Sequence, residues 1–203
     1  GAVNWMTAEN GIVHSERTAA EDLGRDAPME GIQAWVGLPS ADEETDPVFA
    51  HHAADDLPVF DRDGVTYRII AGAAFGQSAP VTVFSPIFYL HGEAPAGSMI
   101  DLPGDYAERA IYIVSGSVSV DGENHDNGRM IVFAAGAAPV IEARADTRFM
   151  LLGGAPLDGK RTVWWNFVSS DPDRLEAAKK KWKSGGFDTV PGDDEEFIPL
   201  PED

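Results

Sequence analysis

The chain has 203 residues, of which 43% are hydrophobic, so it can fold as one large or two small domains. Its 34 acidic and 15 basic residues give a formal net charge of −19, which argues against direct nucleic-acid binding because phosphates are also negative. No cysteine is present. This excludes disulfides, zinc ribbons, thiolate nucleophiles and iron–sulfur clusters, and any metal must have nitrogen and oxygen ligands.

The sequence carries no recognisable targeting or membrane segment. No apolar run approaches the roughly 20 residues that span a bilayer, and no basic start followed by an apolar stretch indicates a signal peptide. We therefore expect a cytoplasmic protein that contacts no membrane. The chain opens at Gly1 directly into what resembles the interior of a domain, so we also expect a missing upstream segment.

Short β-forming runs alternate with polar stretches at the start of the chain. Residues 3–13 predict two short strands joined at a turn around Glu9, Asn10 and Gly11, and residues 31–38 predict another strand. The acidic residues 18–30 between them predict a surface loop. Residues 39–56 bring Ser, Asp, Glu, Thr, Pro and His in quick succession, which predicts an exposed linker and a domain boundary.

The middle of the chain is a series of short β-segments separated by turn residues, which favours an antiparallel barrel or sandwich. In residues 110–123 (AIYIVSGSVSVDGE) we expect a hairpin across Ser115 and Gly116, followed by a tight turn at Asp121 and Gly122. The other expected strands lie within residues 65–72, 81–90, 129–136, 138–144 and 147–154.

Near the end the period changes to that of a helix. Ser170 is the expected N-cap, Pro172 stands in the first turn, and Leu175, Ala178 and Trp182 share one face. The lysines of the last turns complement the helix dipole and predict a solvated face: Lys179, Lys180, Lys181 and Lys183. The acidic, Pro-rich tail that follows is expected to drape over a barrel.

The sharpest chemical signal is GIVHSE at residues 11–16. His14 and Glu16 are two residues apart and would project from the same face of an extended segment. An imidazole nitrogen beside a carboxylate oxygen forms one edge of a metal site that suits Fe(II), Mn, Ni or Cu. Such a pair also occurs often by chance, and taken alone it is better explained as two polar surface residues.

The stretch WMTAENGIVHSE at residues 5–16 resembles the signature of the pirin family within the cupin superfamily. Similarity continues through residues 31–39 (GIQAWVGLP), 85–90 (SPIFYL) and 108–122, and into WWNFVSS and EEFIPLP near the end. The resemblance implies an all-β fold of double-stranded β-helix (cupin) barrels, one partial and N-terminal and one complete and C-terminal, with a C-terminal α-helix and extended tail. We expect residues 1–38 to end the first barrel, 39–58 to be a linker, 59–170 the second barrel and 171–203 the helix and tail.

In the pirin family the His and Glu of this motif are two of four ligands to one iron or related metal, and His14 and Glu16 stand at those positions. The other two ligands are histidines of an HPHRG-type motif that precedes WMTA, and this sequence starts after that point. Fe(II), or Mn, Ni or Cu in its place, is therefore expected only if the upstream pair is present. Glu9 and Asn10 also replace the Gly and Arg that are common in the family at this turn.

The second barrel is expected to be free of metal, because the segment before IYIVSG holds Tyr106, Glu108 and Arg109 but no histidine. We interpret Glu108 and Arg109 as a structural ion pair or surface groups. His91 and Glu93 repeat the spacing of His14 and Glu16, and we favour a strand end running into an exposed turn. The remaining histidines are expected to be solvated, and the tryptophans to pack in cores: His51, His52 and His125, and Trp5, Trp35, Trp164, Trp165 and Trp182.

The resemblance implies more than one function. Some pirin-like proteins are flavonol (quercetin) 2,3-dioxygenases, in which the metal holds the hydroxyl and ketone oxygens of an aromatic substrate while O2 adds to the ring; Glu16 would then also be the general base. Others bind transcription factors or metabolic enzymes, and an acidic surface suits a basic protein partner. A third alternative is an inactive fragment that lacks half the metal site and self-associates through the edge of its incomplete barrel.

Overall fold

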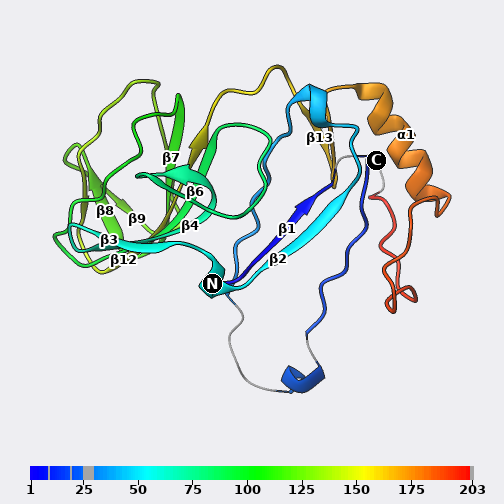
Figure 1. Ribbon diagram of the computed structural model, residues 1–203, viewed down its shortest axis with the longest axis horizontal. Coiled ribbons are helices and arrows are strands. Elements are labelled where there is room, and N and C mark those ends of the chain that lie inside the picture. The colour runs from blue at the N-terminus through cyan, green and yellow to red at the C-terminus, as the bar shows by residue number, and fades with distance from the viewer. Residues whose placement is uncertain (9, 19, 25–29, 202–203) are drawn as a thin grey trace. The chain divides into compact units, whose positions relative to one another are not determined.

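A computed structural model describes residues 1–8, 10–18, 20–24 and 30–201. The chain divides into two compact units, which comprise Gly1–Met6 with Phe49–Pro156, and Thr7–Val48 with Leu157–Asp203 (Figure 1). We call them the barrel unit and the helix unit. The described residues are mostly in strands, with a single α-helix near the C-terminus. The expectation of an all-β fold with one C-terminal helix is therefore confirmed.

One large antiparallel sheet forms the framework of the barrel unit. Its strands follow the order β10-β7-β12-β6-β4-β3, and β5 pairs with β4 at one end. Their bounds are β3 (Val59–Arg62), β4 (Val65–Ala74), β5 (Gln77–Ser78), β6 (Ile87–Ala94), β7 (Glu108–Ser115), β10 (Met130–Phe133) and β12 (Thr147–Gly154). The alternation read from the sequence predicted most of this sheet. Within residues 81–90, however, the strand begins only at Ile87, after Pro86, and a proline has no backbone N–H to give to a ladder.

A second, three-stranded sheet has the order β11-β8-β9. It consists of β8 (Ser117–Val120), β9 (Glu123–Asp126) and β11 (Ile141–Ala143). Val118 and Ile141 of this sheet join Tyr67, Leu90 and Phe149 of the large sheet in one buried hydrophobic cluster. The two sheets thus share a single core, as inward-facing residues of a sandwich or barrel do.

The hairpin expected across Ser115 and Gly116 is wrong. Strands β7 and β8 are consecutive but belong to different sheets, and the chain crosses between them at Gly116, whose φ is +82°. A Cβ there would lie 2.4 Å from the carbonyl oxygen of Asp146, so only glycine fits. The turn expected at Asp121 and Gly122 is confirmed: Val120 pairs with Glu123 across it, and both turn residues have positive φ.

The N-terminal strands also differ from the expectation. Strand β1 (Val3–Thr7) pairs with β2 (Val48–His52), which lies inside the segment expected to be a linker. Residues 11–18 and 31–38 lie in no strand, because no described segment forms a ladder with them. The turn expected around Glu9 includes a residue outside the described ranges. The domain limits proposed from the sequence, at residues 38, 58 and 170, stay predictions.

The helix unit contains α1 (Pro172–Lys183) and the short strands β13 (Thr162–Trp164) and β14 (Phe167–Ser169). The short 3-10 turns are η1 (Ala20–Asp22) and η2 (Ser40–Asp42), and η3 (Ala54–Asp56) belongs to the barrel unit. The N-cap of α1 is Asp171, whose side chain accepts a hydrogen bond from the backbone N–H of Asp173. The expectation of Ser170 as the cap is wrong, because the hydroxyl of Ser170 donates to Glu43.

Aromatic residues of the helix unit pack against one another around Trp182 of α1. Trp165 and Phe187 both contact Trp182 of α1, with ring centroids 5.3 and 5.9 Å away. The ammonium of Lys179 lies 4.2 Å from the centre of the Trp164 ring, so this lysine packs on an aromatic side chain. The expectation that Lys179 belongs to a solvated face is therefore corrected. We call the set the aromatic cluster: Trp164, Trp165, Phe167, Trp182, Phe187 and Phe197.

Candidate functional site

His14 and Glu16 lie in the helix unit, in a segment that joins no described strand. Both residues are exposed. Within the described part of the chain, neither side chain has a hydrogen bond or an ion pair, so no protein group competes for their donor atoms. We had expected these side chains to project from one face of an extended segment that closes a barrel. Among the described residues, no strand pairs with this segment.

The neighbours of these two residues are held by the C-terminal tail. The guanidinium of Arg17 donates from Nε and Nη2 to the two carboxylate oxygens of Asp193, at 2.7 and 2.8 Å, and from Nη1 to Glu196 at 2.6 Å. The side chain of Ser15 also hydrogen-bonds to Asp193. Together the hydrogen bonds from Arg17, the stronger contribution, and from Ser15 lower the pKa of Asp193 to about 2.

The donors present fit one edge of a divalent-metal site. An imidazole nitrogen and a carboxylate oxygen are the ligand types that Fe(II), Mn, Ni and Cu accept. Among the described residues no group of three or more His, Asp or Glu side chains is arranged to hold a metal ion. His14 and Glu16 alone would offer a metal two ligands, so a complete site would need further donors from outside the residues described here.

Large aromatic side chains are packed in the interior of the barrel unit. Tyr67, Phe88 and Phe149 are at most 1% exposed and fill its centre. Tyr106 donates its hydroxyl proton to the carbonyl of Ala73 at 2.6 Å. Arg109 is buried and donates to the carbonyl of Ala137 at 2.6 Å, so it is neither a surface group nor, among the described contacts, the partner of Glu108.

The competing pair His91 and Glu93 lies on β6 and faces away from the core. Phe88, Leu90 and Ala94 of this strand are buried, so the alternate residues His91 and Glu93 point to the opposite face. The two side chains are 4.0 Å apart. Burial lowers the pKa of His91, with the charge of Glu93 acting against it. The pair thus lies in the last half of β6, which ends at Ala94 and runs into a turn as expected, and no third ligand joins it among the described groups.

The other histidines are part of the barrel unit. His51 lies on β2, and its Nδ1 is 2.7 Å from the side-chain oxygen of Asn4 on β1. This contact ties the two strands, while the ring of His51 stays exposed as expected. His125 lies on β9 and is half-buried. Trp5 packs against the small cluster of Leu57, Ala71 and Val81, while Trp35 is 54% exposed.

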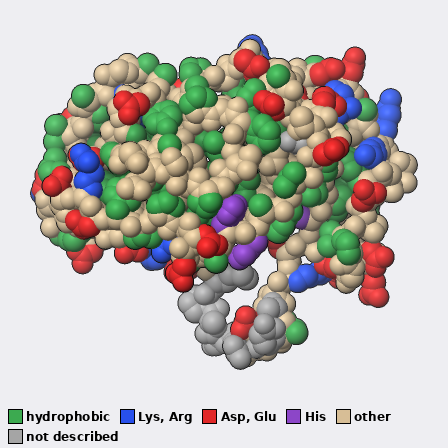
Figure 2. Space-filling model, viewed as in Figure 1, with side chains coloured by type: hydrophobic (Ala, Val, Ile, Leu, Met, Phe, Trp, Pro, Cys, Tyr) green, Lys and Arg blue, Asp and Glu red, His purple; other side chains and the backbone are tan. Residues whose placement is uncertain are grey.

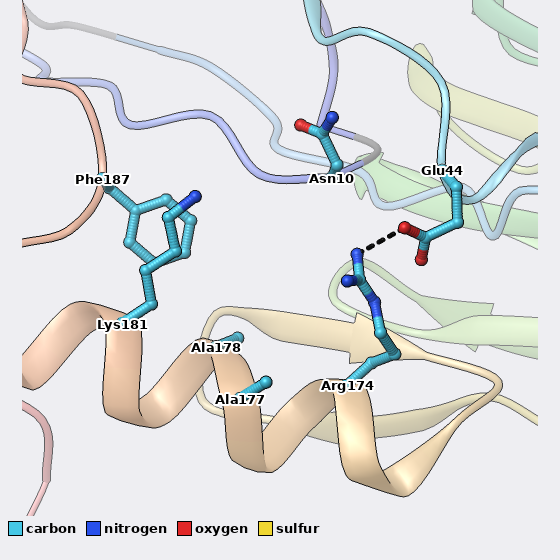
Figure 3. A pocket seen from close by; sticks show the side chains of 7 residues that line it. All are labelled: Asn10, Glu44, Arg174, Ala177, Ala178, Lys181 and Phe187. Atoms are coloured by element: carbon cyan, nitrogen blue, oxygen red, sulfur yellow. Dashed lines mark ion pairs between the residues drawn. The ribbon is translucent and has the colours of Figure 1, made fainter.

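The helix unit also has an open depression of about 350 Å³ beside α1 (Figure 3). Arg174 and Lys181 reach into it from the helix, and Phe187 and Asn10 border it from the two segments opposite. Arg174 is paired with Glu44 at 2.6 Å, and the ammonium of Lys181 lies 4.3 Å from the centre of the Phe187 ring. Arg174 is therefore neutralised by Glu44, whereas Lys181 packs on an aromatic ring and keeps its charge.

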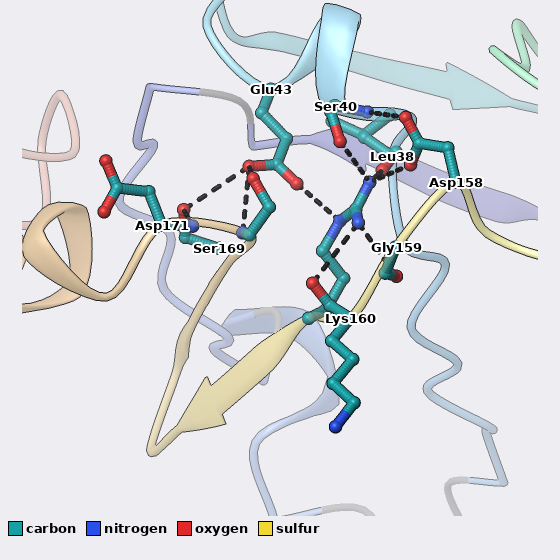
Figure 4. A network of polar contacts seen from close by, with 10 residues as sticks. Leu38, Ser40, Glu43, Asp158, Gly159, Lys160, Ser169 and Asp171 are labelled. Atoms are coloured by element: carbon teal, nitrogen blue, oxygen red, sulfur yellow. Dashed lines mark hydrogen bonds and ion pairs between the residues drawn. The ribbon is translucent and has the colours of Figure 1, made fainter.

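A buried ion-pair network holds the segments of the helix unit together (Figure 4). Arg161 pairs with Glu43, and their side chains are only 6% and 14% exposed. Arg161 also donates to Asp158 at 2.7 Å and to the carbonyl of Leu38 at 2.6 Å. Glu43 accepts from the hydroxyl of Ser170 at 2.8 Å. The sequence analysis singled out neither Arg161 nor Glu43, and the Arg161–Leu38 contact joins residues 123 positions apart.

Two antiparallel sheets around one hydrophobic core, followed by a helix, define a cupin-type β-barrel protein. Residues 1–36 match the family described as Pirin, and residues 89–188 match the Pirin C-terminal cupin domain. A pirin-like protein of Caulobacter vibrioides is 49% identical over 98% of this chain and 69% of its own length. The chain belongs to the pirin family.

Two further relatives carry names that refer to an activity. A putative quercetin 2,3-dioxygenase of Pseudomonas aeruginosa is 32% identical over 91% of this chain and 58% of its own length. The crystal structure of a quercetin 2,3-dioxygenase from Acinetobacter baumannii has a TM-score of 0.73 and 27% identity, and the match covers 83% of this chain and 57% of that one. The chain thus spans little more than half the length of these two relatives.

Among the described residues, no helix has the length and apolar character required to cross a membrane.

Proposed function

We propose that His14 and Glu16 are two of the ligands of a single divalent metal ion in a quercetin 2,3-dioxygenase-type oxygenase. The observation that carries the proposal is the exposed and unpaired state of both side chains, in a segment where pirin-family proteins place two metal ligands. The names of the Pseudomonas and Acinetobacter relatives support the substrate class, a flavonol. The resemblance to the pirin family implies that two further ligands come from a histidine pair of HPHRG type.

The donor set suits Fe(II), with Mn, Ni or Cu as alternatives. When bound, the metal would act as a Lewis acid toward the hydroxyl and ketone oxygens of a flavonol. Glu16 would have a second role: its carboxylate would accept the proton of the substrate hydroxyl, which requires hydrogen-bond distance between the two oxygens. One ring nitrogen of His14 would bind the metal, and the other would remain free to donate a hydrogen bond to a neighbouring group.

A second candidate is a metal-dependent protein-binding role without catalysis. Its support is the formal charge of −19 and the wide distribution of acidic side chains over the face drawn in Figure 2. Such a surface attracts a basic protein partner and speeds its encounter. This candidate uses the same metal ligands, so oxygen consumption distinguishes it from the enzyme.

The test uses the polypeptide in its natural full length, with any residues that precede Gly1. After loading with Fe(II) under anaerobic conditions, addition of quercetin and O2 should give oxygen uptake in step with loss of the flavonol absorbance. His14→Ala and Glu16→Gln should reduce this rate by at least about 100-fold, whereas His91→Ala, a histidine with the same spacing to a glutamate, should leave it unchanged. Stoichiometric metal without any flavonol-dependent oxygen uptake would contradict the enzyme and favour the protein-binding role.

A further inference from the structure

The contacts of residues 14–17 alternate along the segment. Ser15 and Arg17 bind Asp193 of the tail, whereas His14 and Glu16 bind no described group. The tail therefore holds Ser15 and Arg17, while their neighbours His14 and Glu16 stay exposed.

The tail is built to present Asp193 at this place. Val190 accepts a hydrogen bond from the backbone N–H of Asp193 at 3.0 Å, which closes a turn that contains Gly192, with a φ of +79°. This turn directs the Asp193 carboxylate at Arg17, and the second carboxylate, Glu196, completes the contact. Arg17 is thereby held by two acidic groups, one of them in the bidentate geometry that fixes the plane of a guanidinium.

Both ends of this tail segment are anchored on α1. Before the turn, Phe187 packs on Trp182, and its ring is close to Gly11, where a Cβ would lie 2.4 Å from the Phe187 ring. After the turn, Phe197 stacks on Trp182 with ring centroids 5.1 Å apart, and Trp182 donates its indole N–H to the carbonyl of Ile198 at 2.9 Å. Residues 187–198 thus form a closed loop over α1, which we call the strap.

We propose that the strap positions His14 and Glu16 for metal binding, with Asp193 and Glu196 acting through Arg17. This inference rests on the proposed function, because it assigns the strap to the same two ligands. An exposed ion pair contributes little when it must order two free side chains. Here the carboxylates are already held by a loop with two aromatic anchors, so less conformational freedom is lost when Arg17 binds, and the backbone between Gly11 and Arg17 is fixed at both ends.

The test compares two double variants of the full-length polypeptide that remove the same charge. Asp193→Asn with Glu196→Gln breaks the contact with Arg17, whereas Asp194→Asn with Glu195→Gln alters the two carboxylates between them. We expect the first pair to increase amide hydrogen exchange of residues 12–18 and to weaken Co(II) or Fe(II) binding by about 10-fold, as loss of groups that orient metal ligands does. The second pair should change neither quantity, and the thermal midpoint should be the same for both.

Exchange of the charges of Arg17 and Asp193 distinguishes a positioning role for this pair from a general effect on stability. Arg17→Asp alone should weaken Co(II) binding and alter the visible Co(II) spectrum, and Arg17→Asp combined with Asp193→Arg should restore both. The strap proposal is overturned if the unmodified protein binds metal but the Asp193 and Glu196 variant binds it equally well, or if the exchanged pair restores nothing. If the unmodified protein binds no metal, the proposed function and the strap proposal both fail. If it binds metal and only the strap variants behave contrary to expectation, the strap proposal fails alone.

Discussion

Arg161 and Glu43 form an ion pair in which both side chains are largely buried, 6% and 14% exposed. The pair joins two stretches of the helix unit that are far apart in the sequence. Each partner has further hydrogen bonds, from Arg161 to Asp158 and from Ser170 to Glu43 (Figure 4). Arg161 also pairs with Asp158, but removal of Arg161 leaves Glu43 buried without its counter-charge.

The first prediction concerns this pair. Arg161→Ala should lower the free energy of unfolding of the helix unit by about 3 kcal/mol, because Glu43 then loses its counter-charge in a site with little water. Trp164, Trp165 and Trp182 lie in the same unit, so tryptophan fluorescence during chemical denaturation reports the change. Arg174→Ala is the matched control in the same unit: Arg174 pairs with Glu44 at 2.6 Å, with side chains 45% and 57% exposed, and its loss should cost less than about 1 kcal/mol. Equal effects of the two substitutions would refute the assignment.

The second prediction concerns alkaline pH. Burial raises the pKa of Tyr67 from 10 to about 12. The folded state therefore favours the neutral phenol, and the unfolded chain ionises first. Stability from this group is complete below pH 10 and should fall as pH rises toward 12. Equilibrium unfolding at several pH values tests this, with tyrosinate absorbance as the direct readout.

Tyr67→Phe separates this group from other titrations. The phenol oxygen of Tyr67 accepts a hydrogen bond from the backbone N–H of Asp101 at 3.0 Å. The substitution should cost about 1 kcal/mol at neutral pH, because that bond is lost, and should flatten the decline in stability above pH 10. An unchanged alkaline profile in the Tyr67→Phe protein would show that other groups cause it.

The third prediction concerns packing between strands. A Cβ at Gly153 would lie 2.0 Å from the carbonyl oxygen of Glu108 and 2.6 Å from the ring of Phe88. Both neighbours belong to strands paired with β12, so neither can move without breaking the ladder. Gly153→Ala should therefore destabilise the barrel unit by about 3 kcal/mol or more. Gly104→Ala, at an open position with no atom within 4 Å, should be tolerated, and thermal unfolding compares the two.

Much of the barrel could be predicted from the sequence because its signals are local. The alternation of Val65, Tyr67 and Ile69 with polar neighbours gives β4, and the Asp121–Gly122 turn joins two adjacent strands. Pairing between distant strands has no such signal. The assignment of β7 and β8 to separate sheets depends on β12, which lies between β7 and β6 in the sheet. Residues 31–38 have a strand-like pattern but no described partner, since a strand is stable only with a ladder.

The candidate site likewise has one feature with a local sequence signal and others that depend on distant contacts. The spacing of His14 and Glu16 could be recognised in the sequence because two residues in an extended segment share a side. Arg17 gave no signal of its role, since its partner Asp193 lies 176 positions away. The aromatic cluster was also missed as a unit, because Trp182 meets Trp165 and Phe197 through turns that residue spacing does not encode.

The most direct test of the central claim is the metal content of the full-length polypeptide, purified without added chelator and measured by elemental analysis. We expect a stoichiometric divalent metal, iron foremost, that is lost in the His14→Ala/Glu16→Gln protein and retained in the His91→Ala/Glu93→Gln protein. Both pairs have the same spacing, so the comparison isolates position from residue type. Full metal content after replacement of His14 and Glu16 would contradict the account.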